Sequence, residues 1–374
     1  MKGSARFAVL LVLLGCAIAT VVRGGHELPV YPSFYPHEIE IKTLPSDRAG
    51  DALRQAKVQA YVGPGASLSD PPPAEVRAIE SLGSFVIVRL NPASAHAFDE
   101  ASACAAARTV AGTLAGHFVL HPYPVTPFHG DYLHHADLAA AAKARFLEGG
   151  PPVRGLRIKG SNLVQDHPQE SARDADWDAE IIEVDAAGLV ASAMLSVNGW
   201  LAPPWVRTGW FHAERLTADS VVDAEQRRRV ESDLLRLETG DFNALAERIN
   251  LERDLVTALI GSCRKVVIGY TVKREYVNVE YSAGIENIGY DAIAGLHSPI
   301  FIRTVKLKDF PWNGWLALGT ASEPGAAWNP IGGMNDPFGR LMGFAVGDPT
   351  LLPSPYESGW MLNRIADLPA DPAR

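Results

Sequence analysis

The sequence is poor in cysteine, with three residues in a chain of 374. No two cysteines are spaced as Cys-x-x-Cys, and no Cys-x-x-Cys-His string occurs. These spacings are typical of zinc ribbons, thioredoxin-like redox sites and covalently attached c-type haem. The sequence therefore predicts none of the three.

Several catalytic motifs are also missing. The sequence has no Gly-x-Ser-x-Gly nucleophile elbow, no phosphate-binding loop ending in Gly-Lys-Ser/Thr, and no His-Glu-x-x-His zinc motif. Residues Gly63-Pro64-Gly65 lack the third glycine and the following helix of a dinucleotide-binding fingerprint. We therefore predict no nucleotide cofactor, and the sequence alone does not decide whether the protein is an enzyme.

An excess of positive charge is absent as well, since the formal net charge is -9. Nucleic-acid binding needs clustered lysine and arginine to contact phosphates, so we predict no nucleic-acid partner. The one basic cluster, Arg227-Arg228-Arg229, lies among acidic residues on a predicted helix. Such a cluster is typical of a solvent-exposed helix face.

Residues 1–25 are predicted to be a signal peptide or a membrane anchor. A basic start precedes an apolar stretch at 7–22, which is slightly shorter than the roughly 20 residues that span a bilayer. Ala17-Ile18-Ala19 has the spacing of a signal-peptidase site. Leu13-Leu14-Gly15-Cys16 also fits a lipobox, in which Cys16 would be lipidated. Cleavage, lipidation and retention stay open, and we predict a periplasmic protein that is tethered to the membrane.

The segment 26–36 is predicted to be an arm rich in proline and aromatic residues. Prolines at this density favour an extended path without helix. The aromatic and aliphatic side chains between them favour contact with the body or with a partner. The alternative is a simple linker.

If Cys16 is removed or lipidated, Cys104 and Cys263 remain. Two cysteines in an oxidising compartment predict a disulfide. Each lies in an apolar helical stretch, so the alternative is two separate buried thiols.

The fold class is predicted to be α+β. Residues 37–150 alternate strand and helix signals and form a small α/β unit that contains a histidine-rich loop. The double glycine and double proline at 149–152 mark its end. We expect strands at 38–42, 57–62, 85–88 and 118–120, and helices at 47–56, 71–81, 98–114 and 138–147.

Residues 151–374 are predicted to form a larger, β-rich unit. Two predicted helices, each with apolar residues at helical spacing, lie on either side of Thr239-Gly240. They predict a helical hairpin over 222–261. We expect a β-hairpin formed by 180–184 and 189–195. Further strands are expected at 266–270, 276–280 and 300–305.

The histidine-rich loop carries the candidate metal site. Imidazole and carboxylate groups together suit Zn²⁺, Cu²⁺ or iron, and the prolines could hold the ligands in fixed positions. His117 and His121 bracket a predicted strand, which would separate their Cα atoms by about 13 Å, too far for one ion. The alternative is that these histidines bond to backbone carbonyls. The candidate ligands are His121, His129, Asp131 and His134.

The tryptophans form a second candidate site. All eight follow residue 176, and several lie beside glycine, proline or asparagine in predicted loops. Loop tryptophans line ligand clefts or anchor interfaces, although they also fill the ends of β-rich cores. The candidates for ligand or interface contact are Trp200, Trp205, Trp210, Trp312 and Trp315.

Three functional classes follow from these features. The preferred prediction is a membrane-tethered periplasmic accessory or binding subunit of an envelope complex, which would bind a metal through the histidine-rich loop. The first alternative is a metal-dependent periplasmic hydrolase or oxidase. The second is a carbohydrate- or solute-binding protein. The predicted partners are a membrane or periplasmic protein complex, and the membrane itself through the N-terminus.

Overall fold

The computed structural model describes residues 36, 38–148, 151–160, 177–193, 203–309, 314–323, 336–347, 350–355 and 359–363. Several features predicted from the sequence lie outside this part: residues 1–25 with Cys16, nearly all of the arm, Trp200 and Trp312. Of the helices in the described part, none combines the length and the apolar composition needed to span a bilayer.

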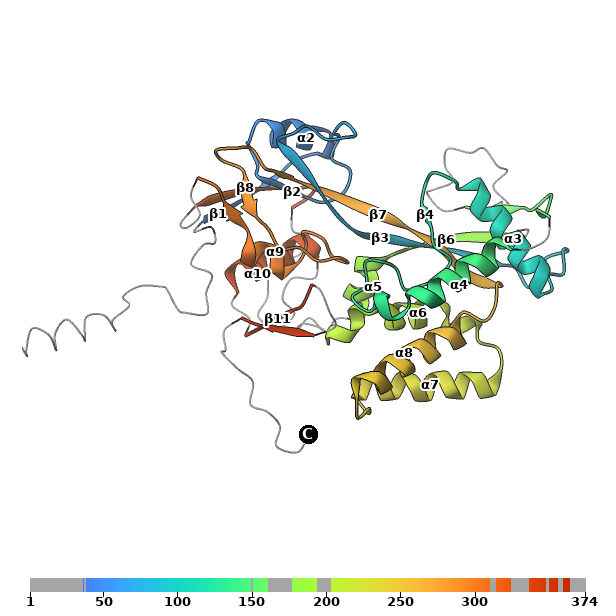
Figure 1. Ribbon diagram of the computed structural model, residues 1–374. Helices are drawn as coiled ribbons and strands as arrows, with labels where there is room; N and C mark the ends of the chain where they lie inside the picture. Colours follow the sequence, from blue (N-terminus) through green and yellow to red (C-terminus); the bar gives the residue numbers. More distant parts are fainter. Residues whose placement is uncertain are drawn as a thin grey trace, which may run out of the picture.

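Among the described residues, eight strands form one mixed sheet. They are β1 (Glu38–Thr43), β2 (Ala60–Val62), β3 (Val76–Leu90), β4 (Val119–Leu120), β5 (Ile158–Lys159), β6 (Ala179–Asp185), β7 (Lys265–Asn278) and β10 (Trp315–Thr320). The order is β1-β10-β2-β7-β3-β6-β5, with β4 also paired to β7. The long antiparallel strands β3 and β7 form the spine of the molecule (Figure 1). Residues 85–88 of β3 are an unbroken apolar run because both faces of the strand are covered there.

The sheet runs across the boundary predicted at residue 150. Strand β3, from the first predicted unit, pairs with β6 and β7 from the second. Strand β1 likewise pairs in parallel with β10. The mixed helix-and-strand composition matches the predicted class, whereas residue 150 does not separate two sheets.

Helices cover the sheet and extend beneath it (Figure 1). Two short ribbons accompany them, β8 (Ile285–Asn287) with β9 (Lys306–Leu307) and β11 (Leu351–Pro353) with β12 (Trp360–Leu362). The α-helices are α2 (Ser46–Arg54), α3 (Glu100–Thr113), α4 (Ala136–Leu147), α5 (Ala186–Ala193), α6 (Gly209–Thr217), α7 (Ala224–Thr239), α8 (Leu245–Leu259), α9 (Pro299–Thr304) and α10 (Pro337–Val346).

Two expected elements were wrong because tertiary or capping contacts decide their structure. The helix expected at 71–81 is replaced by the start of β3, where residues from Val76 onward pair with β7. The second strand of the expected hairpin is wrong in its described part, because residues 189–193 belong to helix α5. The Asp185 carboxylate accepts a hydrogen bond from the Gly188 amide at 2.6 Å, which turns the chain into this helix.

The strand expected at 300–305 was also wrong. This segment is helix α9, with Pro299 in its first turn. Proline is favoured there because its missing N–H would have no helical partner in any case. The Ser298 hydroxyl accepts from the Ile300 amide at 3.2 Å and caps the helix. The apolar run Ile300-Phe301-Ile302 is buried in α9. A buried strand would carry the same apolar run, so hydrophobicity alone could not distinguish helix from strand here.

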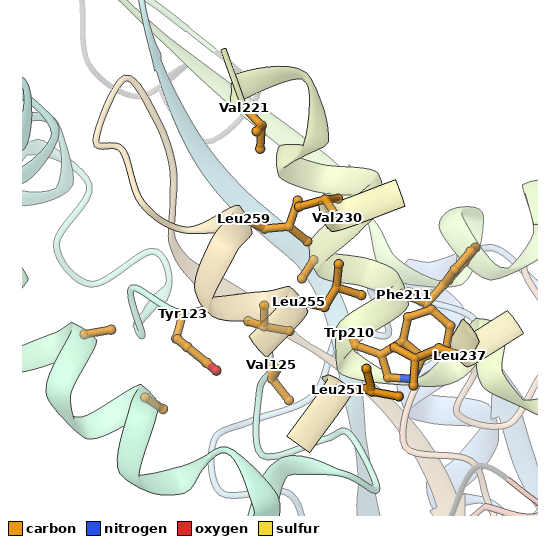
Figure 2. Close-up of a cluster of buried hydrophobic side chains, with 14 of the residues drawn as sticks. Tyr123, Val125, Trp210, Phe211, Val221, Val230, Leu237, Leu251, Leu255 and Leu259 are labelled. Carbon is orange, nitrogen blue, oxygen red and sulfur yellow. The ribbon is translucent and has the colours of Figure 1, made fainter. Parts of the chain in front are cut away.

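Helices α7 and α8 form the expected hairpin and pack with α6 (Figure 2). Gly240 ends α7 in the left-handed conformation, at φ 72°, which glycine adopts without steric cost. Leucines on the inner face of α8 meet Trp210 and Phe211 of α6 in one buried cluster. This cluster fixes α8 against the histidine-rich loop, because Tyr123 and Val125 of that loop belong to it.

We expect Leu255→Ala to lower the free energy of unfolding by about 3 kcal/mol, because it removes a fully buried side chain and leaves a cavity. The matched control is Leu235→Ala on α7, whose side chain is 60% exposed. It should change stability by less than about 0.5 kcal/mol. Urea denaturation followed by circular dichroism measures both, and equal losses would contradict the packing of α8.

Candidate functional site

The histidine-rich loop follows β4 and reaches α4 through a short 3-10 helix, η1 (Tyr132–His134). Strand β4 lies between His117 and His121, as expected, so these two residues are not brought together by a helix. His121 directs its Nε2 toward the Val125 carbonyl oxygen at 2.9 Å. Burial lowers the pKa of His121. A hydrogen bond to a backbone carbonyl is the alternative to metal binding that the sequence suggested for these histidines.

His129 forms a buried pair with His212 of α6. The Thr126 amide donates to Nδ1 of His129 at 2.8 Å, so Nε2 carries the proton and donates to Nδ1 of His212 at 2.9 Å. Nε2 of His212 then donates to the Val206 carbonyl oxygen at 3.1 Å. Burial lowers the pKa of His129 to about 3 and the pKa of His212 well below its usual value. Both rings are therefore neutral, and both nitrogens of His129 already contact protein groups.

Asp131 lies in a buried cluster with His135 and Glu252. One ligand atom from each of the three residues lies within 4.8 Å of the others. Within the described part of the chain, His121, His129 and His134 do not join a group of this kind. Of the four candidate metal ligands, the structure therefore brings only Asp131 into a potential site.

Sequence reasoning missed the other two members of the cluster. His135 was passed over because it is adjacent to His134, and the two cannot easily share one ion. Glu252 is distant in sequence, on α8. It lies three and seven residues before Leu255 and Leu259, on the apolar face of that helix. A carboxylate on an apolar helix face was the signal that could have identified it.

The environment of the cluster is apolar. Burial raises the pKa of Asp131, although its carboxylate oxygens accept from the Gly209 amide at 3.0 Å and so cap α6. Burial raises the pKa of Glu252 to about 7, and Arg248 lies 3.3 Å from one of its oxygens. Burial lowers the pKa of His135 to about 4.

A cavity of about 300 Å³ lies among α5, the segment between β8 and α9, α9 itself and α10. Its walls are mainly apolar, from residues such as Val190, Ile293 and Phe344. The charged and imidazole groups in the lining are Asp185, Arg207, Lys273, Asp291, His297 and Arg340.

Buried ionic contacts hold one wall of this cavity. Arg207 pairs with Asp291, and burial lowers the pKa of Arg207 to about 10. The Asp291 carboxylate also accepts from the Ile293 and Ala294 amides at 2.8 and 2.7 Å. Lys273 donates to the Ala294 carbonyl at 3.0 Å. Charge-assisted hydrogen bonds thus hold the side chains of this wall in fixed positions.

Glu275 makes further hydrogen bonds that connect the segments next to this wall. It is fully buried and accepts from the Gly63 amide at 3.0 Å and the Leu296 amide at 2.7 Å. Burial raises its pKa, but hydrogen bonding to His297 and the charge of Lys273 outweigh this, so the net pKa is lowered. Glu275 is therefore a carboxylate that ties the β2 loop to the segment before α9.

Of the candidate tryptophans, the three in the described part of the chain, Trp205, Trp210 and Trp315, do not line this cavity. Trp205 and Trp210 stack with ring centroids 5.8 Å apart and pack in the helical core of Figure 2. Trp315 is exposed at the start of β10. Trp205 and Trp210 thus occupy the core-filling positions of the alternative interpretation.

Cys104 of α3 and Cys263, in the loop before β7, form a disulfide. Glu100 lies beside this bond and accepts from the Cys263 amide at 2.9 Å. Because both sulfurs are in the disulfide, neither supplies a thiolate ligand for a metal.

No family model and no curated protein matches this chain. Solved structures to which this chain is similar include the oligopeptide-binding protein AppA from Bacillus subtilis, at 10% identity and a TM-score of 0.39, covering 71% of this chain and 59% of that one. Another is NikZ from Campylobacter jejuni in complex with Ni(L-His), at 13% identity and a TM-score of 0.32, covering 65% and 56%. The chain thus spans less than two thirds of the length of these proteins. At such scores the likeness assigns no function.

Proposed function

We propose that this protein is an exported solute-binding protein that holds a small organic acid in the cavity among α5, α9 and α10. The observation that carries the proposal is the cavity itself, with a volume of about 300 Å³ and mainly apolar walls. Small-molecule sites have volumes of about 300–1,000 Å³, and a few polar groups in apolar walls orient the ligand.

The charge of the lining supports an acidic ligand. Three cationic side chains, Arg207, Lys273 and Arg340, face two carboxylates, Asp185 and Asp291. The Asp291 carboxylate is already engaged by two amides and by Arg207. The lining thus carries three cations and two carboxylates, and a carboxylate on the ligand would be attracted by this excess of one positive charge through a charge-assisted hydrogen bond.

This proposal favours the solute-binding alternative over the accessory subunit predicted first. The export signal expected at 1–25 would place the cavity in the periplasm. A membrane complex that takes up the bound solute would then be the partner. The helices around the cavity come from distant parts of the sequence, so a ligand in it would bridge α5 and α10.

Filling the cavity tests the proposal. We expect Ala191→Trp, on the wall formed by α5, to abolish binding of small carboxylic acids, because the indole would occupy the ligand's space. The probes are a panel of aliphatic carboxylic acids, aromatic carboxylic acids and amino acids. Binding of each probe is measured as an increase in the Tm of thermal unfolding. A ligand at 100 times its Kd stabilises the native state by about 2.7 kcal/mol, which corresponds to a rise in Tm of about 3–4 °C for a chain of this length.

The matched control is Ser192→Trp, on the neighbouring, exposed position of the same helix. It should retain the Tm increase that the wild-type protein shows. If no acid in the panel stabilises the wild-type protein, or if Ala191→Trp responds as Ser192→Trp does, the cavity is not the binding site.

A further inference from the structure

The cluster in the histidine-rich loop is separate from the cavity and has its own chemistry. We propose that Asp131, His135 and Glu252 bind one Zn²⁺ ion, which ties the loop and the start of α4 to α8. This ligand set differs from the one that the sequence suggested, because it keeps only Asp131.

The three ligand atoms are already close together. Each lies within 4.8 Å of the others. Zinc binds nitrogen and oxygen at about 2.0–2.2 Å, so tetrahedral ligands are about 3.4 Å apart. Side-chain rotations that bring the atoms closer by about 1 Å would complete three corners of a tetrahedron, and a water molecule would supply the fourth.

Two atoms in the cluster point to a missing ligand. Nε2 of His135 and Oε2 of Glu252 have no hydrogen-bond partner among the described residues. His135 is 0% exposed and Glu252 is 2% exposed. Leaving a buried polar atom unpaired costs about 1–3 kcal/mol, so two such atoms on residues of one cluster need an explanation. A cation between them accounts for both.

The neighbouring groups orient the ligands. The hydroxyl of Tyr123 lies 2.8 Å from Nδ1 of His135. If Nδ1 donates its proton to that oxygen, the lone pair of Nε2 faces Asp131 and Glu252. Zinc-bound histidines commonly donate their other ring N–H to a protein oxygen in this way. The Asp131 carboxylate accepts from Gly209 but has about four lone-pair sites, so it can also bind a metal.

Charge and ligand type favour zinc. Two carboxylates and a neutral imidazole supply three donor atoms and two negative charges to one divalent cation in a buried site. Arg248 lies 3.3 Å from Oε1 of Glu252, and the second oxygen, Oε2, is buried without a hydrogen-bond partner among the described residues. A mixed nitrogen and oxygen set without thiolate or thioether suits Zn²⁺ better than Cu⁺, and the histidine argues against Mg²⁺ or Ca²⁺.

Zinc titration of the untagged protein tests this inference. The protein is stripped with a chelator, dialysed, and titrated with ZnCl₂ in a calorimeter, and the metal that remains after gel filtration is measured by mass spectrometry. We expect one zinc per chain, and a zinc-dependent rise in Tm that the chelator reverses. Glu252→Gln and His135→Gln should each weaken binding by about 100-fold or more, since even changes beyond the direct ligands cost 10–100-fold.

The matched control is His121→Gln, in the same loop but with its Nε2 on the Val125 carbonyl. It should bind zinc as tightly as the wild-type protein. Circular dichroism and gel filtration establish that each variant is folded, and Asp131→Asn replaces any variant that is not. Absence of stoichiometric zinc in the wild-type protein, or equal binding by Glu252→Gln, would overturn the proposal. Loss of zinc only in His121→Gln would do the same.

Discussion

Replacing Arg207 with methionine is expected to lower the free energy of unfolding by about 3–5 kcal/mol. Its partner Asp291 has a side chain that is 1% exposed, so the substitution leaves a buried carboxylate without its cation. The amides of Ile293 and Ala294 remain as donors, but neither supplies a compensating charge. Guanidinium chloride would screen the ion pair, so urea denaturation is the suitable measurement.

A double-mutant cycle separates the ion pair from the packing of the arginine. Asp291→Asn keeps an oxygen for the two amides and removes the charge. We expect the double variant, Arg207→Met with Asp291→Asn, to be more stable than Arg207→Met alone, because no uncompensated charge remains. Strictly additive effects, or a loss below about 1 kcal/mol for Arg207→Met, would show that the pair is not coupled.

The parts of the fold that sequence reasoning predicted depend on local patterns. Helices α7 and α8 were expected because apolar side chains recur at helical spacing and Gly240 separates them. The strand at 85–88 was expected because four apolar residues follow one another. In each case the signal lies within the segment itself.

The parts that failed depend on distant contacts. The segment from Val76 extends as a strand because β7, far along the chain, supplies its hydrogen-bond partners. The pairing of β3 with β6 and β7, which join the sheet across residue 150, likewise depends on segments far apart in the sequence. Composition and a run of glycine and proline residues indicate a loop, but they do not show which strands on either side of the loop will pair.

The same division applies to the candidate sites. The histidine-rich loop was identified from composition, and Asp131 was among its predicted ligands. His135 and Glu252 could not be chosen from spacing, because α8 and the loop are distant in sequence and meet only in the folded chain, where Leu251, Leu255 and Tyr123 share one buried cluster. The cavity left no sequence signal, since its lining comes from segments between 64 and 353.

One segment contacts both sites. Gly209 donates its amide to Asp131 of the proposed zinc cluster, and Arg207, two residues earlier, pairs with Asp291 in the cavity wall. A side chain at 209 is excluded because its Cβ would lie 2.3 Å from Val125. The start of α6 is therefore held between the loop and the cavity, and the close approach at Gly209 is what permits both contacts.

The disulfide is expected to make a contribution to stability as large as that of the buried ion pair. Cys104 and Cys263 are 159 residues apart, so the bond restricts a long segment of the unfolded chain. The loop-closure relation gives about 5 kcal/mol for a loop of this length, and measured losses in secreted domains are about 2–5 kcal/mol. We therefore expect Cys104→Ala with Cys263→Ala to lower the free energy of unfolding by an amount in this range.

Reduction provides the control for that double variant. The wild-type protein in a thiol reductant should unfold at the urea concentration that unfolds the variant, because both lack the same cross-link. The variant itself should be insensitive to reductant. Disulfides of this kind persist in oxidising compartments, so an oxidised bond in protein recovered from the cell would also support the predicted export. An unchanged unfolding midpoint in the variant would mean that the folded chain does not depend on joining α3 to the start of β7.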